Sequence, residues 1–110
     1  MTKLKYLKLG FKFSQELILP SNIKILYIEC NNKYLIDWLP NSIEQLYFGR
    51  YFDSPLNDLP NSIKKISFNK ISKYNYPLNN LPKLLEQLEL PFEYKLEIKN
   101  IPTNCKIVKL

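Results

Sequence analysis

Histidine is missing from this sequence of 110 residues, and glycine occurs only twice. Without histidine the chain has no Ser-His or Cys-His pair and no imidazole base. Gly10 and Gly49 lie far apart in the chain, so they cannot form a glycine-rich phosphate loop. They are also too few for a sandwich built from many tight hairpins. We therefore expect no enzymatic activity and no cofactor.

Cysteine is almost as scarce. Cys30 and Cys105 stand alone, without a C-x-x-C pair or a carboxylate cluster that would indicate a metal site. The N-terminal stretch MTKLKYLKLGFKF is interspersed with lysines and has no continuous apolar segment, so it resembles neither a signal peptide nor a transmembrane helix. Thiols without a secretory signal are normally reduced. The expected localisation is cytoplasmic, with no membrane association.

Arginine is also nearly absent, although the chain is basic. Sixteen basic residues face ten acidic ones, giving a net charge of +6, and Arg50 is the single arginine. Such a charge can attract nucleic acid, acidic proteins or anionic lipid. Lysine is a poor substitute for arginine where bases or phosphates are bound bidentately. With 45% hydrophobic residues, the sequence indicates one folded domain over residues 1–110.

A Leu-Pro or Ile-Pro pair recurs along the whole chain, with steps of 20, 20, 22 and 20 residues between the prolines. These prolines are Pro20, Pro40, Pro60, Pro82 and Pro102. Apolar residues follow each proline three, six and eight positions later, which gives the spacing L-x-x-L-x-L. A periodicity of 20 to 22 residues indicates stacked repeats. The same triplet without a preceding Leu-Pro begins the chain at Leu4.

Each feature of the repeat has a physical reason. The L-x-L step places two apolar side chains on one side of an extended segment, and proline keeps the residue before it extended. We predict a mainly β, leucine-rich-repeat-like parallel solenoid of about six coils with little or no α-helix. Buried positions in its central coils should include Leu46, Ile66, Phe68 and Leu88. The predicted strands are 4–9, 24–28, 44–48, 64–68, 86–90 and 106–110. An ordinary antiparallel sheet is the alternative, disfavoured by the regular period and the lack of turn glycines.

Two stretches carry a resemblance to a known family. FDSPLNDLPNSIKKISF at 52–68 and YNYPLNNLPKLLEQLEL at 74–90 repeat one phrase, and residues 94–102, 32–40 and 13–20 repeat it more loosely. The chain resembles leucine-rich repeats and, more closely, the FNIP repeat of social amoebae and giant viruses. For a viral member the expected location is the host cytoplasm. Family members often carry an F-box and are thought to recruit targets to ubiquitin ligases, a role that we do not extend to a chain containing repeats alone.

The chain departs from longer leucine-rich repeats at one position. Their turn asparagine is matched here by Asn31 alone, while the equivalent positions are occupied by Lys12, Tyr51, Ile71 and Glu93. The turns must therefore satisfy their backbone groups by other means.

The outward positions of the strands provide the candidate functional surface. Aligning the coils gives one column of Tyr6, Ile25, Gln45, Lys65, Gln87 and Ile107 and a second of Lys8, Tyr27, Tyr47, Ser67, Glu89 and Lys109. Tyrosine suits an interface because it offers a large area with a polar tip. We predict a site for a protein partner of unknown identity, formed by Tyr6, Ile25, Tyr27, Gln45, Tyr47 and Lys65. The alternative is that tyrosine and isoleucine are there for strand propensity alone.

Nucleic acid is the second candidate partner. Lys5, Lys24, Lys64 and Lys106 share a predicted column and could bind a single strand with help from nearby tyrosines. Glu44 and Glu86 interrupt that column, which disfavours nucleic acid as the partner. Glu86 or Glu89 could also approach Lys64 and Ser67 on the neighbouring coil, an arrangement that we interpret as solvated surface charge.

The solenoid also makes predictions about the cysteines and the terminal strands. Cys30 and Cys105 should lie four coils apart, roughly 19 Å, so both should be free thiols, with Cys105 at a core position. At the N-terminal edge, Lys3, Lys5, Lys8 and Lys12 should repel a second copy. The C-terminal edge is less guarded, and we predict a homodimer through Lys106, Ile107, Val108, Lys109 and Leu110. A self-assembling structural protein is thus a further alternative.

Overall fold

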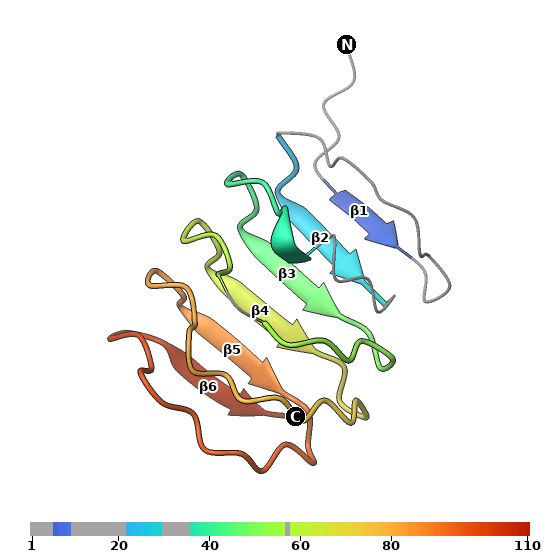
Figure 1. The fold of residues 1–110 in the computed structure, drawn as a ribbon, viewed down its shortest axis with the longest axis vertical. Coiled ribbons are helices and arrows are strands. Elements are labelled where there is room, and N and C mark those ends of the chain that lie inside the picture. Colours follow the sequence, from blue (N-terminus) through green and yellow to red (C-terminus); the bar gives the residue numbers. More distant parts are fainter. Residues whose placement is uncertain (1–5, 10–21, 30–35, 57) are drawn as a thin grey trace.

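The computed structural model of the chain describes residues 6–9, 22–29, 36–56 and 58–110. Within these residues, six strands form one parallel sheet in which spatial order follows sequence order (Figure 1). The strands are β1 (Tyr6–Leu9), β2 (Ile25–Ile28), β3 (Gln45–Phe48), β4 (Lys65–Phe68), β5 (Gln87–Leu90) and β6 (Lys106–Lys109). Each lies within its predicted range, and the parallel solenoid is confirmed.

Residues with the same place in the repeat pair with one another across the first five strands. Leu26 is in register with Leu46, Leu46 with Ile66, and Ile66 with Leu88. All four side chains are fully buried, and Phe68 is buried as well. Because in-register residues share a face of the sheet, one column fills the core. The predicted buried positions in the central coils are confirmed.

Aromatic rings from strands and connecting segments stack along the opposite wall of the core. The rings of Phe48 and Phe52 lie 4.2 Å apart between centroids, and those of Phe68 and Tyr74 lie 4.6 Å apart. Tyr94 continues the row, 6.5 Å from Tyr74. These rings bury the second apolar half of each repeat, which a single coil could not do.

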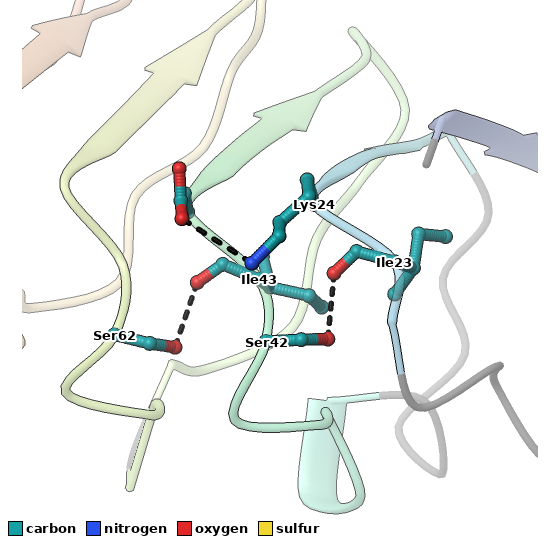
Figure 2. Close-up of polar contacts among 6 residues, drawn as sticks. Ile23, Lys24, Ser42, Ile43 and Ser62 are labelled. Atoms are coloured by element: carbon teal, nitrogen blue, oxygen red, sulfur yellow. Dashed lines mark hydrogen bonds and ion pairs between the residues drawn. The ribbon is translucent and has the colours of Figure 1, made fainter. Parts of the chain in front are cut away.

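The turns that lead into β3 and β4 are hydrogen-bonded to the previous coil through a serine. The Pro60 carbonyl accepts the N–H of Ile63 at 3.3 Å, which closes the turn. The Ser62 hydroxyl then donates to the Ile43 carbonyl at 2.7 Å, and one coil earlier the Ser42 hydroxyl donates to the Ile23 carbonyl at 2.6 Å (Figure 2). The serine after proline is therefore a hydrogen-bonded latch between coils, in addition to a turn former.

The turns that leave the strands are held by backbone bonds, and after β4 also by the Asn69 side chain, which accepts the N–H of Ile71 at 3.0 Å. The positions equivalent to the turn asparagine of longer leucine-rich repeats are exposed and hold Tyr51, Ile71 and Glu93. The Asn69 carbonyl accepts the N–H of Ser72 at 3.0 Å, and the Asn69 N–H donates to the Phe48 carbonyl at 2.9 Å. Backbone groups of these turns are thus bonded within the turn and to the previous coil.

The remaining connections are short and irregular. Helical backbone occurs at residues 36–37 within the described ranges. Asp58 and Asn100 have φ values of 55° and 57°, a left-handed conformation that these two residue types tolerate. Each stands two residues before a repeat proline, where the chain turns toward the next strand. In the described part of the chain, no helix has the length and apolarity that a bilayer crossing requires.

The last strand departs from the predicted register. Ile107 was expected opposite Gln87, but β6 pairs one residue earlier, with Lys106 opposite Gln87, Ile107 opposite Leu88 and Val108 opposite Glu89. Ile107 therefore shares the core face and Val108 the outer face, the reverse of the prediction. Lys109 pairs with Leu90, so its predicted place in the second outer column is also wrong.

The cause of this shift lies where the strands begin. The Glu44 carbonyl accepts the N–H groups of both Lys64 and Lys65. Two residues of this coil therefore face one residue of the previous coil just before β4 begins. At β6 the Glu86 carbonyl accepts the N–H of Lys106, the first residue of the strand, at 2.9 Å. At the start of β6, a single N–H thus bonds to the carbonyl of the previous coil, so β6 pairs with β5 one residue earlier than the other strands would predict.

Cys105 precedes this strand and is a free thiol, as predicted. It packs against the core but remains partly exposed. Its partial burial raises the pKa of the thiol, because desolvation disfavours the thiolate. Cys30 lies outside the described residues.

Candidate interaction surface

The outer face of the sheet brings the six predicted partner-binding residues together. Tyr6, Ile25, Gln45 and Lys65 are successive members of one column, and Lys8, Tyr27 and Tyr47 lie next to one another in the second. Tyr6 is 50% exposed, while Ile25, Gln45 and Lys65 are half-buried by their neighbours. The predicted residues therefore form one continuous surface over β1 to β4.

Two lysines and two tyrosines of this surface form a stack, which we call the Lys-Tyr ladder. The Tyr27 and Tyr47 rings are nearly parallel, with 14° between their planes and 6.4 Å between their centroids. The Lys8 ammonium lies over the Tyr27 ring at 4.9 Å, and the Lys65 ammonium lies over the Tyr47 ring at 5.3 Å. Both lysines are within the range of a cation–π contact. The ladder holds two positive charges at defined places on the sheet.

Gln45 is oriented by the same ladder. The Tyr47 hydroxyl donates to the Gln45 side-chain oxygen at 2.6 Å. This bond turns the carboxamide oxygen toward Tyr47, so the NH2 group is the part of Gln45 that a ligand would meet. The β1–β4 half of the face therefore presents N–H donors and two ammonium groups.

The second outer column changes its chemistry beyond Tyr47, at Ser67 on β4 and Glu89 on β5. Glu89 accepts from the Ser67 hydroxyl through Oε1 and from the Gln87 amide through Oε2, both at 2.7 Å. Each carboxylate oxygen thus has a donor from the protein itself. Ser67 is buried beneath this cluster. The carboxylate is stabilised internally, and its need for an external partner is correspondingly low.

The charged column at the start of the strands is only partly as predicted. Lys24 and Glu44 form an ion pair at 3.5 Å with both side chains about half exposed (Figure 2), so the pair contributes little stability. Lys106 is in register with Gln87, which removes it from the predicted lysine column. Lys5 lies outside the described residues. A hollow of about 400 Å³ beside this column is lined by Glu44, Gln45, Lys64, Lys65, Glu86 and Gln87.

Sequence reasoning missed two members of this surface as site residues. Lys8 was placed in the second column but its contact with Tyr27 was not foreseen, and Glu89 was treated as solvated charge. A lysine directly opposite or diagonal to a tyrosine on the next strand is the available signal, because such cross-strand neighbours are within reach of long side chains. Ser67 lies directly opposite Glu89 by the same rule.

The groups with shifted pKa values in the part of the chain that the structure describes lie away from the outer face. Within these described residues, no group of three or more potential metal ligands is found. Burial raises the pKa of the Tyr74 and Tyr94 phenols, and both belong to the core wall. The raised pKa values of these two tyrosines are therefore a consequence of burial in the core, away from the Lys-Tyr ladder.

Fold and surface together define a class, the parallel β-solenoid repeat proteins that present a flat array of strands. The FNIP Repeat family matches residues 13–51 and 31–71, which together cover more than half of the chain. This chain belongs to the FNIP repeat family. The copy at 74–90 lies outside the matched residues and contains β5, which pairs with β4 like the others. No curated protein and no solved structure gives a significant match.

Proposed function

We propose that this chain is a non-enzymatic protein-interaction module and that it binds its partner through the outer face of β1 to β4. The observation that carries the proposal is the Lys-Tyr ladder. Tyrosines with a fixed orientation offer contact area at a low cost in side-chain entropy. Aromatic residues at the centre of an interface, surrounded by polar groups, commonly supply much of the binding free energy.

The position of the surface supports the proposal. In solenoids a face built from successive repeats is continuous and can contact an extended segment of a partner. Here the tyrosine pair lies on the two middle strands, β2 and β3, and the adjacent column over β1 to β4 consists of Tyr6, Ile25, Gln45 and Lys65. The core beneath β2 to β4 is fully buried and Leu7 beneath β1 is partly buried, so the tyrosine pair rests on well-packed strands.

The test replaces the tyrosine pair and keeps the fold. Partners should be captured from cells that express the chain, identified, purified and titrated against wild type and a Tyr27→Ala/Tyr47→Ala variant. We expect the variant to lose most of its affinity because both central rings are removed. The matched control is Tyr51→Ala, a tyrosine 55% exposed on a turn away from this face. Equal affinity for wild type and the double variant, with unchanged melting temperatures, would refute the proposal.

A second candidate contact is self-association through β6. This strand pairs with β5 in the described part of the chain, and Ile107 and Leu110 are 37% and 36% exposed. An isologous pairing of two β6 edges would cover these apolar side chains and would not propagate. Lys106 and Lys109 are exposed beside them, and Val108 is half-buried.

Light scattering over a range of concentrations tests this contact. We expect a dimer for the 110-residue chain and a monomer for Ile107→Lys, because the register places Ile107 beside the core. Lys83→Ala, on a turn, is a control that should leave the dimer unchanged. A monomer for the wild-type chain at high micromolar concentration would rule the contact out.

A further inference from the structure

The two ammonium groups of the Lys-Tyr ladder lack an acidic partner within the part of the chain that the structure describes. The ion pair found there joins Lys24 and Glu44, whereas Lys8 and Lys65 contact aromatic rings. A cation–π contact fixes the position of an ammonium group without neutralising its charge. The ladder therefore holds two positive charges ready for an anion.

The geometry of the rings restricts what that anion can be. Tyr27 has Lys8 against one side and Tyr47 against the other, and Tyr47 lies between Tyr27 and Lys65. Single-stranded nucleic acid binds such surfaces largely by stacking bases on open aromatic faces. Here the ring faces are occupied, and a ligand meets ring edges, ammonium groups and the Gln45 amide. This favours carboxylates over nucleobases.

We propose that the outer face binds an extended, acidic protein segment whose carboxylates pair with Lys8 and Lys65. The inference rests on the proposed function and names the chemistry of its partner. Lys8 on β1 and Lys65 on β4 are three strand steps apart, about 14 Å across the sheet, and two residues apart along the strands, about 7 Å, so their positions are roughly 16 Å apart. In an extended peptide, residues i and i+4 lie on the same side and about 13 Å apart. Two acidic residues with that spacing reach the two lysines, because glutamate and lysine side chains extend well beyond their backbones, and an apolar residue between them meets the tyrosine edges.

The rest of the face limits where such a segment can lie. Glu89 places a negative charge over β5, with both its oxygens already bonded to Ser67 and Gln87. An acidic segment is repelled there and attracted over β1 to β4, so the charge distribution selects one half of the sheet. Glu44 is paired with Lys24 and opposes the segment less than a lone carboxylate would.

The experiment measures fluorescence anisotropy of a labelled, otherwise Ser/Gly peptide with glutamates at i and i+4 and a leucine at i+2. Wild type is compared with Lys8→Gln/Lys65→Gln. The control is Lys70→Gln/Lys73→Gln, which makes the same change in charge at two exposed lysines on the turn after β4. We expect the first variant to bind roughly 5- to 30-fold more weakly and the control to change by less than about twofold. Affinity should also fall with salt, because the contacts are ionic.

Further arms of the experiment separate the sources of binding. A peptide with glutamines at i and i+4, one with glutamates at i and i+2, a random oligonucleotide and phosphatidylserine vesicles should all bind more weakly than the probe. Equal loss of affinity in both lysine variants, or tighter binding of oligonucleotide or vesicles, would overturn the inference. A natural partner that needs Tyr27 and Tyr47 but is indifferent to Lys8→Gln/Lys65→Gln would retain the proposed function and reject the acidic segment.

Discussion

The strands β4 and β6 carry the same spacing of apolar residues and differ in what surrounds them. Ile66 in β4 is fully buried between coils on both sides, whereas Ile107, which shares the core face of β6, is 37% exposed. Phe68 in β4 is covered by Phe48 and Tyr74. In β6 the residue at the corresponding register position is Lys109, which is exposed.

This difference shows that the repeat sequence determines strand formation separately from burial and register. The L-x-x-L-x-L spacing makes a strand in both places, because alternation and the preceding proline act locally. Burial and register depend on a neighbour on each side, because a shift of one residue is resisted only where it would move apolar side chains out of a sealed core. At β6 that resistance is weaker, and the strand adopts a different register.

The largest expected effect compares truncation in the two strands. Ile66→Ala should lower the free energy of unfolding by roughly 2–5 kcal/mol, because it leaves a cavity in a closed core. Ile107→Ala should cost about 1–2 kcal/mol, because its side chain is already partly in water and leaves no closed cavity. Urea denaturation followed by circular dichroism measures both. Similar losses for the two variants would show that β6 is as well packed as β4.

The next effect compares the buried tyrosines of a central coil and the last coil. The Tyr94 hydroxyl donates to the Tyr76 carbonyl at 2.8 Å, whereas the Tyr74 hydroxyl is buried with no partner in hydrogen-bonding geometry in the described part of the chain. Tyr74→Phe should therefore stabilise the protein by about 1–2 kcal/mol, and Tyr94→Phe should destabilise it by about 1 kcal/mol. Thermal and urea unfolding of both variants check the opposite signs; two losses would mean that Tyr74 also has a donor or acceptor.

Alkaline pH should increase the difference in stability between wild type and Tyr74→Phe. Burial raises the pKa of Tyr74, helped by the nearby phenols of Tyr94 and Tyr76 and by Asp53. Tyr74 thus stays protonated in the folded state, while an unfolded tyrosine ionises near pH 10. Its contribution to stability is present below about pH 10 and is lost as the pH rises toward the folded-state pKa, with a slope of at most about 1.4 kcal/mol per pH unit.

Urea unfolding at pH 9 and pH 11 measures this loss. The stability of Tyr74→Phe should fall less over that interval than the stability of wild type, because the variant lacks the titrating phenol. Comparing the two proteins cancels the titration of the lysines, which both contain. Parallel declines would indicate that Tyr74 ionises in the folded state as readily as in the unfolded chain.

The central coils could be predicted from sequence because their signals are local and repeated. The interval between prolines places the strands, and alternation assigns Leu46 to the core and Tyr47 to the outer face. The register of β6 could not be read in this way, because it depends on whether one residue is taken up before the strand begins. Pro102 lies 20 residues after Pro82, which is the usual spacing, so the positions of the prolines do not indicate the shift.

The surface was predictable as a set of positions and not as a set of contacts. Alternation places Tyr27 and Tyr47 side by side on the outer face. The contacts of Lys8 and Lys65 with these rings depend on side-chain rotamers across neighbouring strands, which no sequence period specifies. The Glu89 cluster likewise depends on Ser67 and Gln87 turning toward one carboxylate.

The smallest effects concern the serine latch, which the central coils have and the coil of β5 lacks. Ser62→Ala removes the hydroxyl that donates to the Ile43 carbonyl and should cost about 1 kcal/mol. Leu84 stands at the equivalent place, two residues after Pro82, and is 61% exposed. Leu84→Ser should supply the missing donor to the neighbouring coil while removing an exposed apolar side chain. We expect a gain of a few tenths of a kcal/mol, measured by urea denaturation against Leu84→Ala, which removes the side chain without adding a hydroxyl. A Leu84→Ser variant no more stable than Leu84→Ala would show that the turn before β5 is too far from Ile63 for the latch to form.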